Sequence, residues 1–239
     1  MELKYIREVR LKNKIHKNSY LRNIAAVKYL EKNPLVFDNE VTFFVGENGA
    51  GKSTVIEAIA SAMRLNTEGG TKNYTGHRFS VANDAPDLEQ HIIVAKEDYP
   101  KEMFFLRAES MYNLINFLEN YGSTRYTEKY HQQSHGETLI DIISSFKGDG
   151  LYIFDEPESA LSPSKMLTLM LYIHNLVKRN SQLIIATHSP ILMAYPGADI
   201  FLFSENGIDK VKYTDTEHYQ ITKLFLDHPE RMIKELFRE

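Results

Sequence analysis

The chain contains no cysteine among its 239 residues. That absence excludes a disulfide framework and any metal site built from thiolates. No apolar run approaches the roughly 18 residues of a membrane-spanning helix, and the N-terminus lacks the apolar core and small-residue cleavage site of a secretory signal. We therefore expect a cytoplasmic protein without direct membrane insertion, folded as one large α/β domain spanning residues 1–239.

Net charge is small, at −4, but it is unevenly distributed. Residues 1–28 carry a local charge of +6, which leaves −10 for the remainder. A basic edge of this kind could meet a nucleic-acid backbone, although it is more often the solvated face of an edge hairpin. The basic residues are Lys4, Arg7, Arg10, Lys12, Lys14, Lys17, Arg22 and Lys28.

Strand and helix patterns alternate along the chain, which predicts a mainly parallel sheet with helices on its faces. Residues 1–45 look like several short strands, and 66–90 like a long loop. Further strands are expected at 92–94, 103–106, 151–154 and 183–186, and helices at 111–118, 139–146, 163–179 and 218–237, with Pro229 interrupting the last.

Residues 46–53 read GENGAGKS, the complete phosphate-binding pattern G-x-x-x-x-G-K-S. Residues 41–45 before it are β-branched and aromatic, as in a buried strand, and 54–65 after it have helical spacing. A glycine loop between strand and helix lets backbone N–H groups and the helix N-terminus surround phosphate oxygens. The pattern therefore predicts that this chain binds a nucleoside triphosphate.

Each residue of the loop has an expected role. Lys52 reaches the β- and γ-phosphates, and the Ser53 hydroxyl is a ligand of Mg²⁺. The expected nucleotide-binding residues of the loop are Asn48, Gly49, Ala50, Gly51, Lys52, Ser53 and Thr54.

Two acids follow directly after the apolar run 151–154. Four apolar residues running into two carboxylates would leave buried charge without a partner unless a cation site lies there. We expect Asp155 to hold Mg²⁺ and Glu156 to polarise the water that attacks the γ-phosphate.

The order of the following motifs resembles the ABC-type ATPases. Residues 155–162 read DEPESALS and 187–190 read THSP after a strand. The resemblance implies that His188 contacts the γ-phosphate and that the loop after Glu156 crosses the interface of an ATP-dependent homodimer. It also implies an N-terminal antiparallel β portion and a small helical lobe at about 104–147.

The family also carries a serine-glycine signature that caps the ATP of the partner subunit. Residues 133–137 read QSHGE, so that Ser134 and Gly136 match it, whereas His135 replaces a glycine and Glu137 a glutamine. A serine hydroxyl and a glycine N–H at a helix N-terminus can bind an anion. Ser134 and Glu137 equally satisfy a helix capping box, and both descriptions can hold together.

Two further family positions stay open between candidates. Glu109 or Arg107 stands where the family has a glutamine between its two lobes. Tyr20 or Tyr5 is the candidate aromatic for stacking on adenine.

The resemblance covers most of the chain and is closest to small stand-alone ATPases related to the recombination and chromosome-maintenance (RecF/SMC-like) ATPases. It implies Mg²⁺-dependent ATP hydrolysis coupled to nucleic acid or to a separate effector protein. The alternative is the nucleotide-binding subunit of an ABC transporter. A ring-forming AAA-type motor is a third class, but the THSP motif fits the ABC arrangement better.

Overall fold

The computed structural model describes residues 5–66, 70–71, 88–107 and 134–237. Within these ranges a seven-stranded sheet has the order β10-β9-β3-β8-β7-β6-β4. The five central strands are parallel, and only the edge strands β10 and β4 run antiparallel to their neighbours. The strands are β3 (Val41–Gly46), β4 (Gly70–Thr71), β6 (Glu102–Arg107), β7 (Gly150–Asp155), β8 (Gln182–Ala186), β9 (Asp199–Ser204) and β10 (Gly207–Lys210).

A smaller antiparallel sheet has the order β2-β1-β5, formed by Leu35–Val36, Ile6–Leu11 and Ile92–Lys96. These two sheets confirm the predicted α/β fold with an N-terminal antiparallel portion. The prediction of strands throughout 1–45 was wrong at α1 (Ala25–Leu30), which follows the 3-10 turn η1 (Tyr20–Asn23). Ala26, Val27 and Leu30 are buried there at helical spacing, so one helical face packs on the core.

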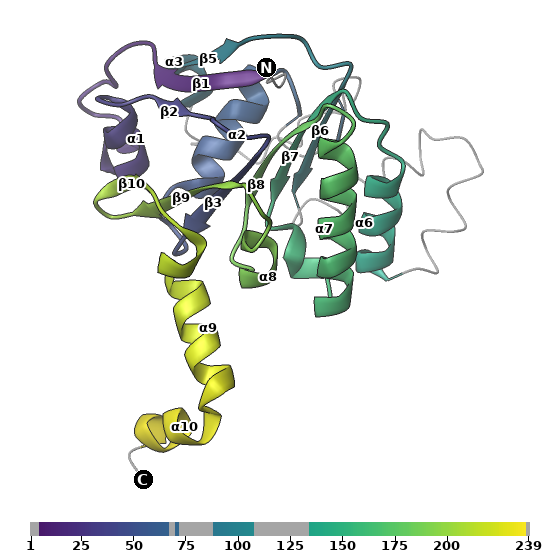
Figure 1. The fold of residues 1–239 in the computed structure, drawn as a ribbon. Coiled ribbons are helices and arrows are strands. Elements are labelled where there is room, and N and C mark those ends of the chain that lie inside the picture. The colour runs from purple at the N-terminus through teal and green to yellow at the C-terminus, as the bar shows by residue number, and fades with distance from the viewer. Residues whose placement is uncertain (1–4, 67–69, 72–87, 108–133, 238–239) are drawn as a thin grey trace.

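Helices cover both faces of the large sheet (Figure 1). On one face lie α2 (Lys52–Ala62), α3 (Leu88–His91) and the small sheet; on the other lie α6 (His135–Ser144), α7 (Pro163–Val177) and α8 (Pro190–Met193). Short 3-10 turns, η3 (Pro157–Ala160) and η4 (Tyr213–Asp215), connect elements.

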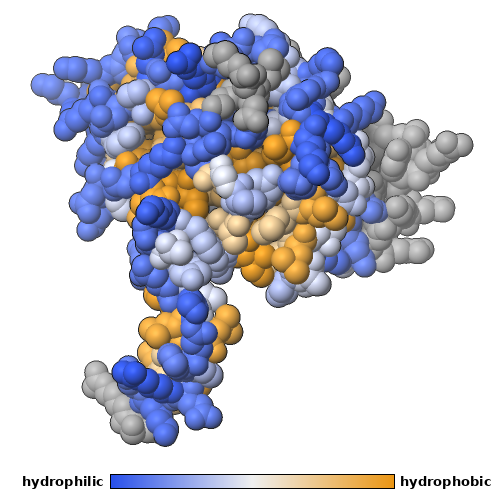
Figure 2. Space-filling view, in the orientation of Figure 1, coloured by the Kyte–Doolittle hydropathy of each residue, from blue (hydrophilic) through white to orange (hydrophobic). Residues whose placement is uncertain are grey.

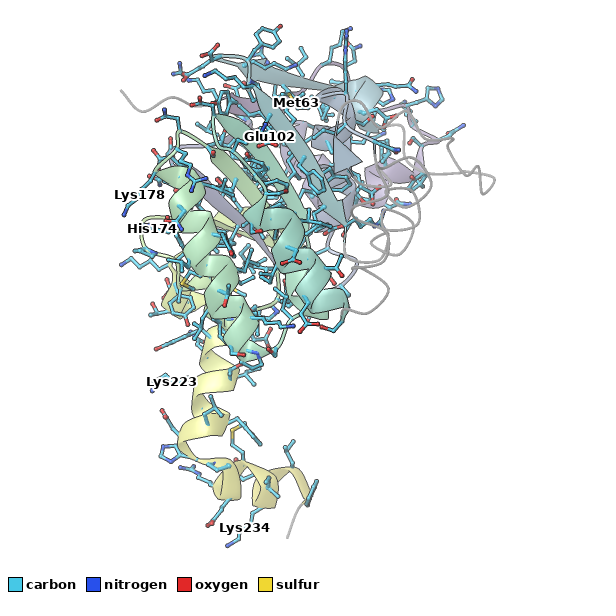
Figure 3. All side chains as sticks on the ribbon, turned by 90° about the vertical axis from the view of Figure 1, so that its right-hand side faces the viewer. Met63, Glu102, His174, Lys178, Lys223 and Lys234 are labelled. Atoms are coloured by element: carbon cyan, nitrogen blue, oxygen red, sulfur yellow. The ribbon has the colours of Figure 1, made fainter. Side chains whose placement is uncertain are left out.

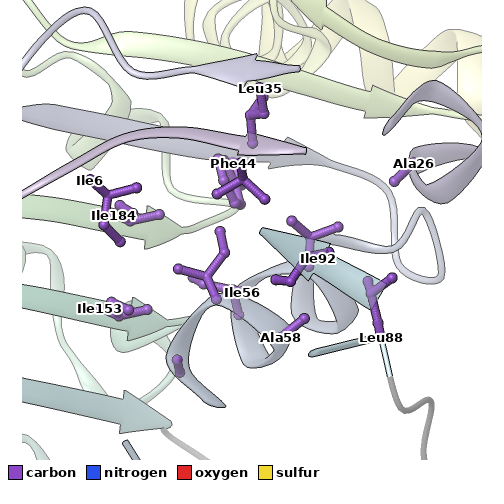
Figure 4. Packing of buried hydrophobic residues seen from close by; sticks show 14 of the residues in the cluster. Ile6, Ala26, Leu35, Phe44, Ile56, Ala58, Leu88, Ile92, Ile153 and Ile184 are labelled. Carbon is purple, nitrogen blue, oxygen red and sulfur yellow. The ribbon is translucent and has the colours of Figure 1, made fainter. Parts of the chain in front are cut away.

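Successive side chains of a strand serve opposite faces, so the fully buried strands feed two separate cores. Phe44, Ile153 and Ile184 point to the core around α2, where they lie near Ile56 and Ile6 (Figure 4). The neighbouring residues along the same strands, Phe43, Phe154 and Ile185, join the core under α6 and α7.

Other predicted elements agree with the structure to within a few residues, including the interruption of the C-terminal helix at Pro229. The first residues of the helical lobe expected at about 104–147 continue strand β6, and α6 lies at its end. The predicted helix 111–118 and most of the predicted loop 66–90 lie outside the described residues.

The C-terminal helices α9 (Glu217–Asp227) and α10 (Pro229–Phe237) extend from the body as an arm (Figure 1). The labelled Lys223 and Lys234 lie on this arm, away from the sheet (Figure 3). Figure 2 shows apolar side chains gathered on it; those of α9 are Ile221, Leu224, Phe225 and Leu226, all exposed. In the described part of the chain, no helix combines the length and apolar character of a membrane span.

A buried glutamine joins the two sheets. The side-chain oxygen of Gln182 accepts hydrogen bonds from the backbone N–H groups of Tyr5 (3.0 Å) and Ile6 (2.8 Å). Its amide nitrogen donates to the Ile6 carbonyl at 2.8 Å. Gln182 is completely buried, so no water can replace these bonds.

Replacing Gln182 by leucine should lower the free energy of unfolding by about 3 kcal/mol, because buried backbone groups of β1 lose their partners. Denaturant unfolding measures this loss. The control Gln90→Leu, at an exposed position, should change stability by less than about 0.5 kcal/mol. Equal stability of the two variants would contradict the role of Gln182.

Candidate functional site

The site lies where the parallel strands end. In register, Asp155 at the end of β7 pairs with Arg107 of β6 on one side and with Ala186 of β8 on the other. The Thr187 N–H donates to the Phe44 carbonyl of β3 at 3.0 Å. Consequently the residues that follow β3, β7 and β8 meet at one edge of the sheet, as in other open α/β sheets that bind ligands there.

The phosphate loop joins β3 to α2. Gly51 is the N-cap of α2, with φ +98°, and a Cβ there would come within 2.7 Å of the Ile24 side chain, so glycine is required. Asn48 and Gly49 are exposed, whereas Ala50, Ser53 and Thr54 are half-buried. The loop therefore presents its tip to solvent and anchors its base under α1.

Lys52 is buried, with 4% of its surface exposed. Its ammonium donates to the carbonyls of Gly46 (2.6 Å) and Glu47 (2.9 Å) and so lies within the loop. Burial lowers the pKa of Lys52, while the carboxylates of Glu156 and Asp155 act in the opposite direction. The site thus holds a partly desolvated cation, which binds an incoming anion strongly.

The two predicted magnesium ligands are in contact. The Ser53 hydroxyl donates to Asp155 Oδ1 at 3.3 Å. Asp155 is buried, which raises its pKa to about 6, with Arg107 opposing that rise and Glu156 adding to it. Hydroxyl and carboxylate oxygens suit Mg²⁺, which usually completes its shell with substrate phosphates and water. Within the described residues no group of three or more His, Asp or Glu side chains could hold a metal alone.

Arg107, one candidate for the interlobe position, forms an ion pair with Glu57 of α2 at 2.5 Å. Its charge lowers the pKa of Asp155 and so favours the ionised form of that carboxylate. Arg107 therefore supports the electrostatics of the site from β6. The other candidate, Glu109, lies outside the described residues.

Glu156 and His188 face each other. Glu156 adopts the left-handed conformation, with φ +50°, and its N–H donates to the Ala186 carbonyl. Its carboxylate oxygen lies 3.3 Å from His188 Nε2, without the alignment of a hydrogen bond. A non-glycine residue in this conformation is uncommon, and such strain is typical of functional sites.

A neighbouring carboxylate holds the histidine backbone. Glu158, in η3, accepts a hydrogen bond from the His188 N–H at 2.5 Å. This contact fixes the segment after β8 against the segment after β7. Sequence reasoning did not single out Glu158, although it lies within the 155–162 motif.

The signature candidates lie elsewhere on the chain. Ser134 is exposed, and its N–H donates to the Glu137 carboxylate at 2.8 Å, as the capping box predicts. Its hydroxyl donates to the same carboxylate oxygen at 2.8 Å. Lys165 of α7 donates to the Ser134 hydroxyl at 3.3 Å. Gly136 packs on η3, where a Cβ would lie 2.4 Å from the Ala160 carbonyl oxygen. Their described contacts are thus with α7, Glu137 and η3 rather than with the phosphate loop.

A cavity of about 750 Å³ extends from the phosphate loop to α1 and the end of β9. Tyr20 lines it and is 45% exposed. Tyr5, in contrast, is buried and donates its hydroxyl proton to the Asn180 carbonyl. Of the two aromatic candidates, Tyr20 therefore has the position for a nucleotide base, and the alternative at Tyr5 was wrong.

One residue near the site comes from the C-terminal arm. His218, in the first turn of α9, lies 3.0 Å from His188, measured between Nε2 and Nδ1. No sequence motif marks this residue, since the contact depends on where α9 begins.

Comparisons with known proteins bear on the family and the fold. Residues 74–194 match the family model described as "AAA domain, putative AbiEii toxin, Type IV TA system". That stretch covers half of the chain and includes Ser134, Asp155, Glu156 and His188, but not the phosphate loop. The fold is similar to that of cbiO1 from Clostridium perfringens, part of the ABC transporter complex cbiONQ, with a TM-score of 0.51, 17% identity and coverage of 98% and 99% of the two chains.

Two curated relatives match most of this chain at low identity. The nucleoside import ATP-binding protein NupA of Lactococcus lactis subsp. cremoris is 23% identical over 82% of this chain, which spans only 43% of NupA. The energy-coupling factor transporter ATP-binding protein EcfA of Methanosphaera stadtmanae is 27% identical over 75% of this chain and 73% of its own.

These relatives are named as transporter proteins, so they do not support the resemblance to recombination and chromosome-maintenance ATPases. The family match, the fold and the ATP-binding relatives nevertheless agree on the type of enzyme. The chain belongs to the family described as "AAA domain, putative AbiEii toxin, Type IV TA system", and it is an ABC-type P-loop ATPase.

Proposed function

We propose that two copies of this chain enclose ATP and hydrolyse it with the residues gathered at the strand ends, Lys52, Ser53, Asp155, Glu156 and His188. The observation that carries the proposal is their convergence from β3, β7 and β8, shown by the Ser53–Asp155 and Glu156–His188 contacts. Chance would not bring a phosphate loop, two acids and a histidine to one edge.

Binding rests on the loop and on one carboxylate. Lys52 exchanges the carbonyls of Gly46 and Glu47 for phosphate oxygens, while the loop N–H groups and the start of α2 bind the remaining oxygens. Ser53 and Asp155 hold Mg²⁺, which when bound neutralises developing charge on the phosphates. The aromatic ring of Tyr20 stacks on the adenine base.

Hydrolysis rests on Glu156 and His188. Glu156 orients a water and accepts its proton as the oxygen attacks the γ-phosphorus. The bond from that phosphorus to the β–γ bridging oxygen breaks, which leaves ADP and inorganic phosphate. His188 donates a hydrogen bond to the γ-phosphoryl oxygens, whose charge changes most in the transition state.

The second copy completes the site. Ser134 is exposed at the N-terminus of α6, an orientation that leaves it accessible to another molecule. In the proposed dimer, Ser134 and Gly136 of each copy contact the ATP bound by the other. This arrangement makes dimerisation depend on bound ATP.

The partner favoured by the relatives is a membrane transporter. NupA and EcfA are named as ATP-binding proteins of import or transport systems, and cbiO1 as part of an ABC transporter complex. We therefore place the transporter subunit ahead of action on nucleic acid. The basic segment at 1–28 is the one feature that favours nucleic acid, and stimulation of ATP hydrolysis by added duplex DNA would reverse this order.

The second candidate function is that of the toxin in a toxin–antitoxin (TA) system, supported by the description of the matching family. Measuring bacterial growth under controlled expression distinguishes the transporter subunit from the toxin. The transporter reading predicts normal growth, with the protein recovered on membranes when its partner is present. Growth arrest that the Glu156→Gln substitution relieves would favour the toxin.

We expect Lys52→Ala to abolish ATP binding and turnover with the fold intact. The substitution removes a charge-assisted contact to two phosphates, worth about 1.5–3 kcal/mol for each hydrogen bond. Purified protein is assayed for nucleotide affinity and phosphate release, with Lys178→Ala, an exposed lysine directly after α7, as the matched control for affinity. Normal nucleotide affinity in Lys52→Ala would refute the loop assignment.

Glu156→Gln keeps the shape of the side chain but not its basic carboxylate, so bound ATP should persist. We expect this variant to be dimeric in light scattering with Mg-ATP and monomeric without nucleotide. Adding Ser134→Arg should abolish dimerisation while each chain still binds ATP. If light scattering gives Glu156→Gln the same mass with and without Mg-ATP, the isolated chain does not form the nucleotide-enclosing dimer.

A further inference from the structure

The C-terminal arm places a second histidine behind the first. His218 Nε2 and His188 Nδ1 are 3.0 Å apart, and the two ring centroids are 5.1 Å apart with planes inclined by 53°. This geometry is that of a hydrogen bond between imidazoles rather than of stacked rings. His188 is therefore held on the side away from Glu156.

The start of α9 is fixed firmly enough to position a side chain. Thr216, fully buried, caps the helix: its hydroxyl accepts from the Tyr219 N–H and donates to the Tyr213 carbonyl at 2.8 Å. Tyr213 and Tyr219 also pack ring to ring, with centroids 4.6 Å apart. His218 therefore belongs to the anchored first turn, although the rest of the arm is exposed.

The hydrogen bond between the two rings requires one imidazole to donate its proton and the other to accept it. Neutral imidazole carries one N–H, so one ring of the pair donates and the other accepts. The Glu156 carboxylate, 3.3 Å from His188 Nε2, favours an N–H at that nitrogen. His188 Nδ1 then accepts, and His218 donates its Nε2 proton. Burial and the nearby charge of Lys52 lower the pKa of His218, which favours the neutral ring.

We propose that His218 is a positioning residue that holds His188 with its Nε2–H directed at the γ-phosphate, so that the C-terminal arm completes the ATPase site. The inference rests on the proposed function, because it assigns His218 an effect only through His188. It adds α9 to the elements that build the site.

The surroundings agree with this role. A cavity of about 570 Å³ lies between the phosphate loop and α9, lined by Glu47, Asn48, His188, Glu217, His218, Ile221 and Thr222. The charged groups that act on His218 come from α2, from the loop and from its own helix: Lys52, Glu47 and Glu217. Both histidines thus border the space beside the loop.

Turnover separates a positioning role from a structural one. His218→Leu should lower kcat about tenfold and leave KM for ATP within about twofold, because the lost hydrogen bond matters most in the transition state. His218→Gln presents an amide N–H at the same distance along the side chain and should recover most of the activity. His228→Leu, an exposed histidine at the end of α9, is the matched control and should match the unmodified chain.

A double-mutant cycle with His188→Ala gives the decisive result. If His218 acts through His188, His218→Leu should lower kcat no further in the His188→Ala background. An equal loss in both backgrounds, or normal kcat in His218→Leu alone, would overturn the positioning role and leave the proposed function intact. Normal kcat in His188→Ala would instead remove the histidine from the proposed function, and this inference with it.

Discussion

The contact between Ser53 and Asp155 is the constraint on which the rest of the site depends. It joins the first turn of α2 to the end of β7, two elements far apart in the chain. Asp155 is almost fully buried, and a buried carboxylate is costly unless charges and hydrogen bonds compensate it. Arg107 on the neighbouring strand, itself paired with Glu57, supplies part of that compensation. The acid can stay in the interior only because these groups surround it, and a bound cation would add to them.

This constraint explains how a mainly apolar sheet supports ionic chemistry. Strands β3, β7 and β8 are buried along their whole length, so they are stabilised by packing on both faces. Between their ends these strands are mainly apolar, and the parallel arrangement gathers the polar residues that follow them at one edge. The body thus provides a rigid base.

Much of this arrangement could be predicted from the sequence because its signals are local. The phosphate loop specifies its own strand and helix, and an apolar run ending in Asp155 and Glu156 identifies a central strand by composition alone. The capping box at Ser134 and the break at Pro229 are equally local.

Other features depend on distant contacts and carry no such signal. Tertiary packing determines three of them: the ion pair of Arg107 with Glu57, the burial of Tyr5, and the hydrogen bond between His218 and His188. Helix α1 was mistaken for strand because its short apolar pattern fits either structure. The sequence also leaves the partner open, since no residue of an ATPase site specifies what the enzyme drives.

The central claim is that the signature of one copy meets the phosphate loop of another around ATP. The absence of cysteine allows a direct measurement, since any introduced pair is unique. Asn48→Cys and Ser134→Cys, both at exposed positions, are combined in the Glu156→Gln variant and oxidised with and without Mg-ATP. The account predicts a disulfide-linked dimer on a non-reducing gel with Mg-ATP alone, and none from either single-cysteine variant. A monomer in both conditions, or cross-linking indifferent to ATP, would contradict it.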